Sequence, residues 1–293
     1  MKCLLSVKAY AKVNLHLAVG KKGLDGFHPI VSLFHKVSLY DDIEITLNKD
    51  VSSFSVLLKM DKDYQIDMKE NIGYKAAMLF FNRYRKQSSW PLVHCFIMIK
   101  KRIPFGGGLG GGSSDAAAIL KALNELYENP FSQEALMEMG AKLGSDVPFF
   151  LCKEAALVKG RGEIVVPYKT KSKPYILLVK PDICVSTKEA YNWIDEYKGF
   201  VLDLAKEEER VKLVLQKKEV WDESFFNSFE EVVSNNVKSI KTLLSILRGY
   251  NKNSAMSGSG SVCFSIFDSE DEMKRVAKNI EQNGLSIWQK KLL

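Results

Sequence analysis

The N-terminal segment alternates between apolar and more polar positions. Its apolar residues are Val7, Ala9, Ala11, Val13, Leu15, Leu17 and Val19, and the residues between them include Lys12, Asn14 and His16. A period of two is typical of a half-buried β-strand. We therefore predict a strand here, with Lys12, Asn14 and His16 on one face.

Other patterns in the first half of the chain predict a mixture of strands and helices. Residues 20–26 are rich in turn formers, apolar runs at 43–47, 54–58 and 93–99 predict strands, and residues 72–84 have the spacing of a helix. Because strands and helices do not alternate strictly, this half has the pattern of an α+β fold.

The middle of the chain is dominated by helical spacing. Apolar residues over 116–127 predict a helix that ends at Asn129-Pro130, and a second helix begins near Ser132 and ends at Gly144. Residues 145–148 then predict a turn, and two strands flank residues 160–162.

The pattern changes after residue 172. We predict a strand at 175–179, a charged helix at 206–218, one long helix at 224–247 capped by Gly249, and a final strand, helix and strand. The apolar stretch 225–233 is assigned to the core. A lobe boundary near residue 168 would divide the chain into an N-terminal lobe, 1–168, and a C-terminal lobe, 169–293.

The composition is that of an ordinary globular protein. With 293 residues, 46% of them hydrophobic, the chain can bury the cores of two lobes. Its apolar runs are far shorter than the roughly twenty residues of a membrane helix, and its N-terminus has no signal-peptide pattern. We expect a cytoplasmic protein without a membrane partner.

The net charge and the potential metal ligands exclude few classes of function. The five cysteines and four histidines show neither a CxxC nor an HExxH spacing, so we expect no protein-built metal site. The net charge of +7 would suit an anionic ligand such as a nucleotide. Lys and Arg are nevertheless spread along the chain without a nucleic-acid-binding motif, so we expect no nucleic-acid partner.

The glycine-rich segment is the most informative part of the sequence. Six of the nineteen glycines lie within 106–112, directly before the helix of residues 116–127. Glycine lets the backbone approach a ligand closely, and the first N–H groups of a helix attract phosphate. We predict that the segment binds the phosphates of a nucleotide, through Pro104, Gly106, Gly107, Gly108, Leu109, Gly110, Gly111, Gly112, Ser113 and Ser114.

Other glycine motifs fit this segment poorly. A flexible linker would not lie tightly between a strand and a helix. The spacing Gly106-x-Gly108-x-x-Gly111 matches a dinucleotide fingerprint, but a second helix follows where a Rossmann unit needs a parallel strand. No Lys-Ser or Lys-Thr pair follows the glycines, and the HRD and DFG triplets of protein kinases are missing.

Three segments in this order resemble the GHMP kinase superfamily. They are Ala11-Lys12-Val13-Asn14-Leu15, the glycine-rich segment, and Ser257-Gly258-Ser259-Gly260. The resemblance implies a two-lobed α+β fold with an N-terminal lobe like ribosomal protein S5 domain 2 and a C-terminal α/β-plait lobe. It also implies an active site between the lobes.

Three further segments are similar to one branch, the 4-diphosphocytidyl-2-C-methyl-D-erythritol kinases. They are Asp25-Gly26-Phe27-His28, Gly144-Ser145-Asp146-Val147-Pro148 and Gly160-Arg161-Gly162-Glu163. This resemblance implies phosphorylation of the 2-hydroxyl of 4-diphosphocytidyl-2-C-methyl-D-erythritol by ATP with Mg²⁺, for isoprenoid precursor biosynthesis. We expect a monomer or homodimer. Another GHMP kinase activity and a non-catalytic nucleotide-binding protein remain as alternatives.

The resemblance also implies roles for single residues. Asp146 matches the catalytic base and Lys12 its basic partner. The remaining implied contacts are to substrate, from Asn14, Phe27, His28, Asp146, Thr187 and Tyr191, and to the adenine region, from Asn71 and Lys101. Three positions depart from the usual pattern: Tyr10 replaces proline, Ser145 replaces alanine, and Phe27 replaces tyrosine.

Overall fold

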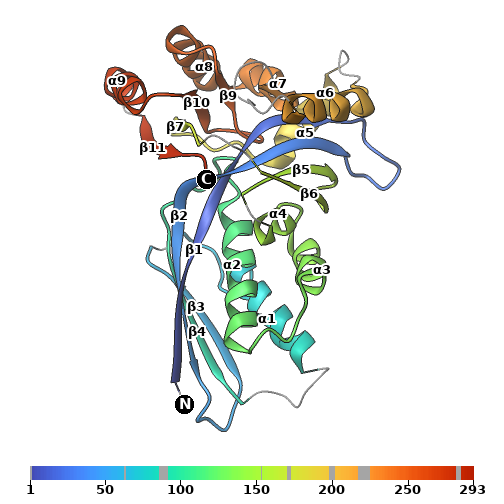
Figure 1. The fold of residues 1–293 in the computed structure, drawn as a ribbon, viewed down its shortest axis with the longest axis vertical. Coiled ribbons are helices and arrows are strands. Elements are labelled where there is room, and N and C mark those ends of the chain that lie inside the picture. The colour runs from blue at the N-terminus through green and yellow to red at the C-terminus, as the bar shows by residue number, and fades with distance from the viewer. Residues whose placement is uncertain are drawn as a thin grey trace. The chain divides into compact units, whose positions relative to one another are not determined.

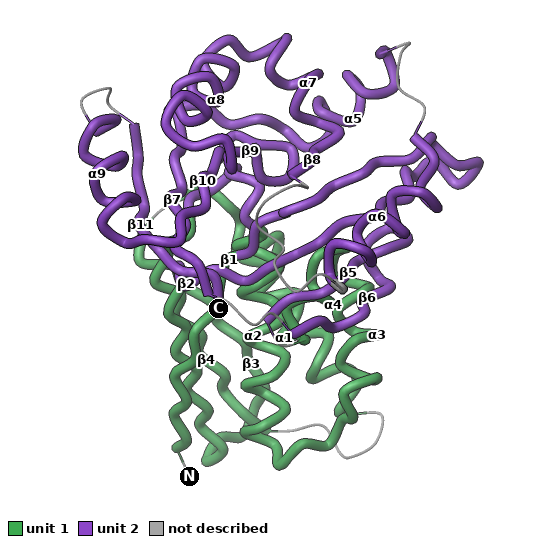
Figure 2. Tube along the Cα trace, turned by 45° about the horizontal axis from the view of Figure 1, so that its top comes forward, with its two compact units in different colours: residues 1–11, 40–103, 110–153 green, residues 12–39, 104–109, 154–293 purple. Residues whose placement is uncertain are grey.

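The computed structural model describes residues 2–62, 64–85, 92–152, 154–169, 173–197, 202–216, 225–281 and 285–293. The chain folds into two compact units, and neither is continuous in sequence (Figure 2). The first unit comprises residues 1–11, 40–103 and 110–153. The second comprises residues 12–39, 104–109 and 154–293.

The first unit combines strands with a group of helices (Figure 1). The C-terminal part of β2 pairs antiparallel with β4, with Asp42 opposite Lys100, and β3 pairs parallel with β4. Helix α1 packs on β3, α2 and α3, and α2 also contacts α4. The elements of this unit are β1 (Lys2–Val19) and β2 (Ile30–Asn48), both shared with the second unit, β3 (Ser55–Met60), α1 (Ile72–Tyr84), β4 (His94–Lys100), α2 (Gly111–Leu126), α3 (Gln133–Leu143) and α4 (Val147–Leu151).

The second unit contains a four-stranded antiparallel sheet in the order β11-β7-β10-β9, on which α8 and α9 pack. The N-terminal part of β2 pairs with β5, β5 pairs with β6, and the end of β1 pairs parallel with β8. Its further elements are β5 (Ala155–Gly160), β6 (Ile164–Tyr168), β7 (Tyr175–Lys180), α5 (Thr187–Glu196), α6 (Leu204–Gln216), β8 (Phe226–Asn227), α7 (Ser228–Asn236), α8 (Lys238–Tyr250), β9 (Ser254–Met256), β10 (Cys263–Phe267), α9 (Glu270–Ile280) and β11 (Ser286–Lys291).

Strand β1 carries the segment Ala11-Lys12-Val13-Asn14-Leu15, which we call the first motif. The burial of β1 differs from the predicted half-buried strand. Residues 2–8 show the alternation of a half-buried strand, but from Ala9 onward nearly every residue is buried on both faces. Lys12, Asn14 and His16 are 4%, 2% and 1% exposed. Polar side chains buried to this extent require polar partners. The Lys12 Nζ donates to Asn14 Oδ1, and the His16 Nε2 lies 3.1 Å from Glu207 Oε2.

Most predicted elements are confirmed, and three differ. The predicted turn at 145–148 ends in a short helix, α4, which begins at Val147. The helix at 72–84 is α1, but α2 begins among the glycines, at Gly111, because Gly110 takes the left-handed conformation with φ 69° before it. The predicted helix at 224–247 is wrong: α7 and α8 are separate helices divided at Val237, whose backbone is extended. Gly249 lies inside α8 rather than capping it. Residues 217–218 and 224 lie outside the described part.

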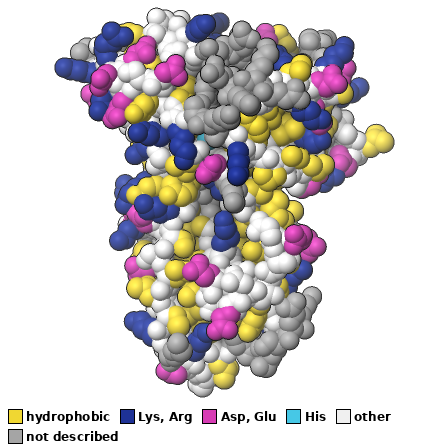
Figure 3. Space-filling model, in the orientation of Figure 1, with side chains coloured by type: hydrophobic (Ala, Val, Ile, Leu, Met, Phe, Trp, Pro, Cys, Tyr) yellow, Lys and Arg dark blue, Asp and Glu magenta, His cyan; other side chains and the backbone are white. Residues whose placement is uncertain are grey.

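The described helices and surface add two observations. No helix in the described part of the chain is long and apolar enough to cross a membrane. On the face drawn in Figure 3, Lys and Arg side chains lie in small groups among acidic and hydrophobic ones rather than in one continuous patch. That distribution agrees with a basic solvated surface.

Candidate active site

The glycine loop, defined as residues 104–109, lies in the second unit. It packs against the loop that carries Ser257-Gly258-Ser259-Gly260, which we call the third motif. Gly106 and Gly108 have φ angles of 64° and 72°. The hydroxyl of Ser257 donates to the carbonyl oxygen of Gly108 at 3.1 Å, and the N–H of Val262 donates to that of Gly107 at 3.3 Å. A Cβ on Gly108 would lie 2.1 Å from the carbonyl oxygen of Ser257. Only glycine allows this approach.

The part of β1 that belongs to the second unit, from Lys12 onward, makes hydrogen bonds to the same two loops. The backbone N–H of Lys12 donates to the carbonyl oxygen of Leu109 at 3.0 Å, and that of Asn14 to the hydroxyl of Ser257 at 3.4 Å. The Lys12 Nζ donates to Asn14 Oδ1 at 2.6 Å, which confirms that the two side chains share a face. The Lys12 Nζ also lies 4.4 Å from the ring centroid of Phe34. Lys12 therefore contacts the glycine loop through its backbone, while its buried ammonium group lies beside Asn14 and Phe34.

A second group of predicted residues surrounds His28 in the same unit. Its Nδ1 donates to the carbonyl oxygen of Gly20 at 2.9 Å, and its Nε2 lies 3.2 Å from Asp195 Oδ1. The imidazole stacks on Tyr191 of α5, with ring centroids 4.9 Å apart. These contacts fix the plane of a buried, polar aromatic ring.

Phe27 and Thr187 lie at the surface of the second unit. Phe27 is 55% exposed, and the guanidinium of Arg161 lies 4.2 Å from its ring centroid. Thr187 begins α5, and its hydroxyl lies 3.1 Å from that of Ser259 in the third motif. The first residue of α5 thus lies against a loop that also contacts the glycine loop.

In the first unit, the start of α2 and the turn before α4 lie close together. The hydroxyl of Ser113 is 3.8 Å from the position that a Cβ would take on Gly144. The hydroxyl of Ser114 donates to the carbonyl oxygen of Tyr10 at 2.6 Å. Asp146 is half-buried at the N-cap of α4, where its side chain makes no capping hydrogen bond. The side chain of Asp146 therefore does not cap α4.

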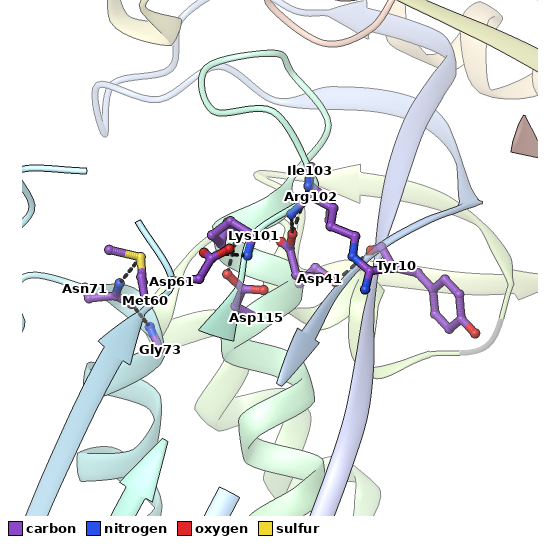
Figure 4. A network of polar contacts seen from close by, with 11 residues as sticks. Tyr10, Asp41, Met60, Asp61, Asn71, Gly73, Lys101, Arg102, Ile103 and Asp115 are labelled. Atoms are coloured by element: carbon purple, nitrogen blue, oxygen red, sulfur yellow. Dashed lines mark hydrogen bonds and ion pairs between the residues drawn. The ribbon is translucent and has the colours of Figure 1, made fainter. Parts of the chain in front are cut away.

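Asn71 and Lys101 have structural partners in the first unit (Figure 4). The Asn71 Oδ1 accepts from the N–H of Gly73 at 2.8 Å and caps α1. The Lys101 Nζ lies 2.5 Å from Asp41 Oδ2 and 2.7 Å from Asp115 Oδ2. Both side chains are thus committed to contacts that the sequence did not predict.

Comparison with known proteins identifies the family. The GHMP kinases N terminal domain model matches residues 71–154, and the GHMP kinases C terminal model matches residues 218–285. A 4-diphosphocytidyl-2-C-methyl-D-erythritol kinase of Thermodesulfovibrio yellowstonii is 34% identical to this chain, and the match covers 95% of each of the two chains. That of Thermosipho africanus is 36% identical, covering 94% of this chain and 95% of its own. This chain belongs to the 4-diphosphocytidyl-2-C-methyl-D-erythritol kinase family.

Solved structures agree with the family. A crystal structure of 4-(cytidine 5'-diphospho)-2C-methyl-D-erythritol kinase matches with a TM-score of 0.77 at 31% identity, over 98% of this chain and 99% of that one. L. major mevalonate kinase, at 16% identity and a TM-score of 0.70 over 99% and 96%, shares the fold. Family membership confirms the predicted two-lobed α+β GHMP kinase fold and the prediction of a small-molecule kinase.

Asn227 is a residue beside these kinase motifs that we had assigned to the core. It is 7% exposed, and its Nδ2 donates to the carbonyl oxygens of Met256 and Gly258 at 2.7 and 2.8 Å. Its Oδ1 accepts from the N–H of Phe229 at 2.9 Å and caps α7. The only local signal was an asparagine in front of a helical pattern, which predicts a cap but not the contacts to the third motif.

Proposed function

We propose that this chain transfers the γ-phosphoryl group of ATP to the 2-hydroxyl of 4-diphosphocytidyl-2-C-methyl-D-erythritol, in isoprenoid precursor biosynthesis. Family membership supports both the reaction and the acceptor. The observation that supports the proposal most directly is the convergence of Lys12, the glycine loop and Ser257 in the second unit. Close backbone approach beside a buried ammonium suits a polyphosphate.

The proposed reaction uses Asp146 as the base. Its carboxylate accepts the proton of the acceptor hydroxyl while the hydroxyl oxygen bonds to the γ-phosphorus, the bond to the bridging oxygen breaks, and ADP leaves. Lys12 offsets charge on the transferring phosphoryl group. The position of Asp146 at the N-cap of α4, within the residues matched by the GHMP kinases N terminal domain model, supports this role.

We assign the cytidine end of the substrate to the group around His28. Its two ring nitrogens contact Gly20 and Asp195, so an approaching base would meet an imidazole of fixed orientation. Tyr191 and the exposed Phe27 offer aromatic faces for stacking, and phenylalanine retains this capacity where relatives carry tyrosine. Thr187, at the N-terminus of α5, suits the substrate phosphates, and Asn14 the acceptor alcohol.

The proposal treats Mg²⁺ as part of the nucleotide. Among the described residues, no group of three or more His, Cys, Asp or Glu side chains could hold a metal ion. Mg²⁺ can be coordinated by phosphate oxygens and water, and when bound it neutralises charge on the β- and γ-phosphates. We also propose a cytoplasmic location, which suits the five free cysteines.

The first test is substrate-dependent ADP formation combined with Asp146→Asn. The protein is expected to release ADP with 4-diphosphocytidyl-2-C-methyl-D-erythritol, and not with mevalonate or homoserine. Asp146→Asn is expected to lower kcat about 1,000-fold while the Kd for ATP changes little. The control is Asp268→Asn, at an exposed position after β10, which should retain full turnover.

Two outcomes would contradict the proposal separately. Turnover of mevalonate or homoserine instead of the cytidylated substrate would assign the chain to another GHMP kinase activity. Turnover of Asp146→Asn within tenfold of the parent would exclude Asp146 as the base and leave the substrate assignment intact.

A further inference from the structure

Three charged side chains of the first unit form what we call the Lys101 cluster: Asp41, Lys101 and Asp115. The Nζ of Lys101 lies 2.5 Å from Asp41 Oδ2 and 2.7 Å from Asp115 Oδ2 (Figure 4). The three side chains are 0%, 9% and 6% exposed, in the order Asp41, Lys101, Asp115. Buried charges at these distances interact strongly, so the cluster resists rearrangement.

The cluster holds the chain just before the glycine-rich segment. The second oxygen of Asp41 accepts from the backbone N–H groups of Arg102 and Ile103, at 2.5 and 2.8 Å. The N–H of Lys101 donates to Asp61 Oδ1 at 3.0 Å. Three successive backbone N–H groups therefore end on carboxylates, which fixes the path of residues 101–103.

The cluster also holds the start of α2. Asp115 is in the first turns of this helix, and a Cβ on Gly111 would lie 3.0 Å from Ile103 Cγ2 and 3.5 Å from the Lys101 Nζ. The first residue of α2 thus packs directly on the segment that Asp41 fixes. Within the first unit, the residues on both sides of the glycine loop are held at one place.

The charges of the cluster do not cancel when all three groups are ionised. Two carboxylates and one ammonium leave a net charge of −1. Burial and the neighbouring Asp41 raise the pKa of Asp115 to about 7 against the opposite influence of Lys101. Although burial alone would lower the pKa of Lys101, the two carboxylates raise it, so the ammonium remains charged. The cluster therefore gains its net negative charge near neutral pH.

One carboxylate oxygen of Asp115 can carry the proton that this titration requires. Its Oδ1 is buried and has no hydrogen-bond partner in the described structure. The other titratable groups facing the cluster are Asp61 and Tyr64, and burial raises the pKa of Tyr64, which therefore stays neutral. Arg102 pairs with Asp42. The proton equilibrium near pH 7 is therefore assigned to Asp115, beside Lys101.

We propose that the Lys101 cluster is a positioning device for ATP: it sets the place of the first N–H groups of α2, and its net charge opposes the bound polyphosphate. This inference rests on the proposed role of the glycine-rich segment. A negative charge at a helix N-terminus stabilises the free helix but repels a second anion there. Deprotonation of the cluster therefore weakens ATP binding.

Calorimetric titration with ATP at pH 6, 7 and 8 tests the inference. Asp115→Asn and Asp41→Asn each remove one negative charge while keeping a side chain of the same shape. The ratio of the parent Kd to the variant Kd is expected to rise roughly two- to fivefold from pH 6 to pH 8. Taking this ratio removes the titration of ATP itself. A ratio that is constant with pH for both variants would overturn the inference.

Charge rescue distinguishes this role from direct contact with adenine. Lys101→Met leaves two buried carboxylates without a counter-ion and should weaken ATP binding at least tenfold. Adding Asp115→Asn should recover most of that loss. Failure of the double variant to bind better than Lys101→Met would assign Lys101 to nucleotide contact instead. Because binding needs no turnover, failure of the proposed catalytic function would not affect these results.

Discussion

The two parts of the glycine-rich segment are held by different chemistry. The glycine loop, in the second unit, depends on neutral hydrogen bonds and close backbone contact, with Gly108 against Ser257 as the tightest point. The start of α2, in the first unit, depends on the charged Lys101 cluster. A neutral contact of this kind is sensitive to side-chain volume and insensitive to pH. The Lys101 cluster should instead be sensitive to pH and less sensitive to side-chain volume.

The largest expected effect is steric and comes from Gly108→Ala. The new Cβ would lie 2.1 Å from a backbone oxygen and the residue would keep φ near 72°, so both loops must shift. A shift of about 1 Å at a phosphate-binding loop can cost about 100-fold, and we expect at least that loss in kcat/KM for ATP. Steady-state kinetics measures it.

Gly112→Ala is the matched control at the other part of the segment. There the nearest atom to a new Cβ is Ile72 Cγ2 at 3.3 Å, and the residue is already helical. We expect a loss below about tenfold, since alanine also favours the helix. Equal losses of kcat/KM for the two substitutions would contradict the claim that the glycine loop is the part of the segment more sensitive to side-chain volume.

The second prediction concerns the neutral support provided by Asn227. Asn227→Ala leaves two carbonyl oxygens and the N–H of Phe229 without their partner in a buried place. The free energy of unfolding should fall by roughly 2–4 kcal/mol. Because none of these groups titrates, the loss should be the same at pH 6 and pH 8 in urea unfolding. Asn236→Ala, which removes one partly buried bond to the carbonyl oxygen of Val232, should cost less than about 1 kcal/mol.

The difference between local and long-range contacts explains what the sequence could predict. Alternation placed Lys12 and Asn14 on one face, and their side chains do meet, because a strand repeats every two residues whatever it packs against. The same alternation could not predict that this polar face is buried. That burial depends on Ser257 and Phe34, which are distant in sequence.

The misses have the same cause. Asp41 follows an ordinary strand pattern, and its role comes from Arg102 and Ile103, about sixty residues away. No glycine or proline marks the break at Val237 between α7 and α8, so helical spacing ran across it. The lobe boundary near residue 168 and the roles of the single site residues remain predictions.

The smallest expected effect is the pH dependence of stability. The pKa of Asp115 rises from 3.8 to about 7 on folding, so between these values the folded state binds more protons than the unfolded state. The free energy of unfolding therefore falls as pH rises through this range, and the loss is complete above pH 7. Asp115→Asn removes that loss. We expect the variant to lose roughly 2–3 kcal/mol less than the parent between pH 5 and pH 8 in urea unfolding.

A comparison between parent and variant is needed because His35 acts in the opposite direction. Burial lowers its pKa from 6.5 to about 4, so the unfolded state binds the extra proton and stability from this group is lost as pH falls below about 6.5. Both proteins carry His35, so its contribution cancels in the difference between them. Parallel pH profiles for parent and Asp115→Asn would show that the start of α2 is held without a titrating charge. The two parts of the glycine-rich segment would then not differ in their response to pH.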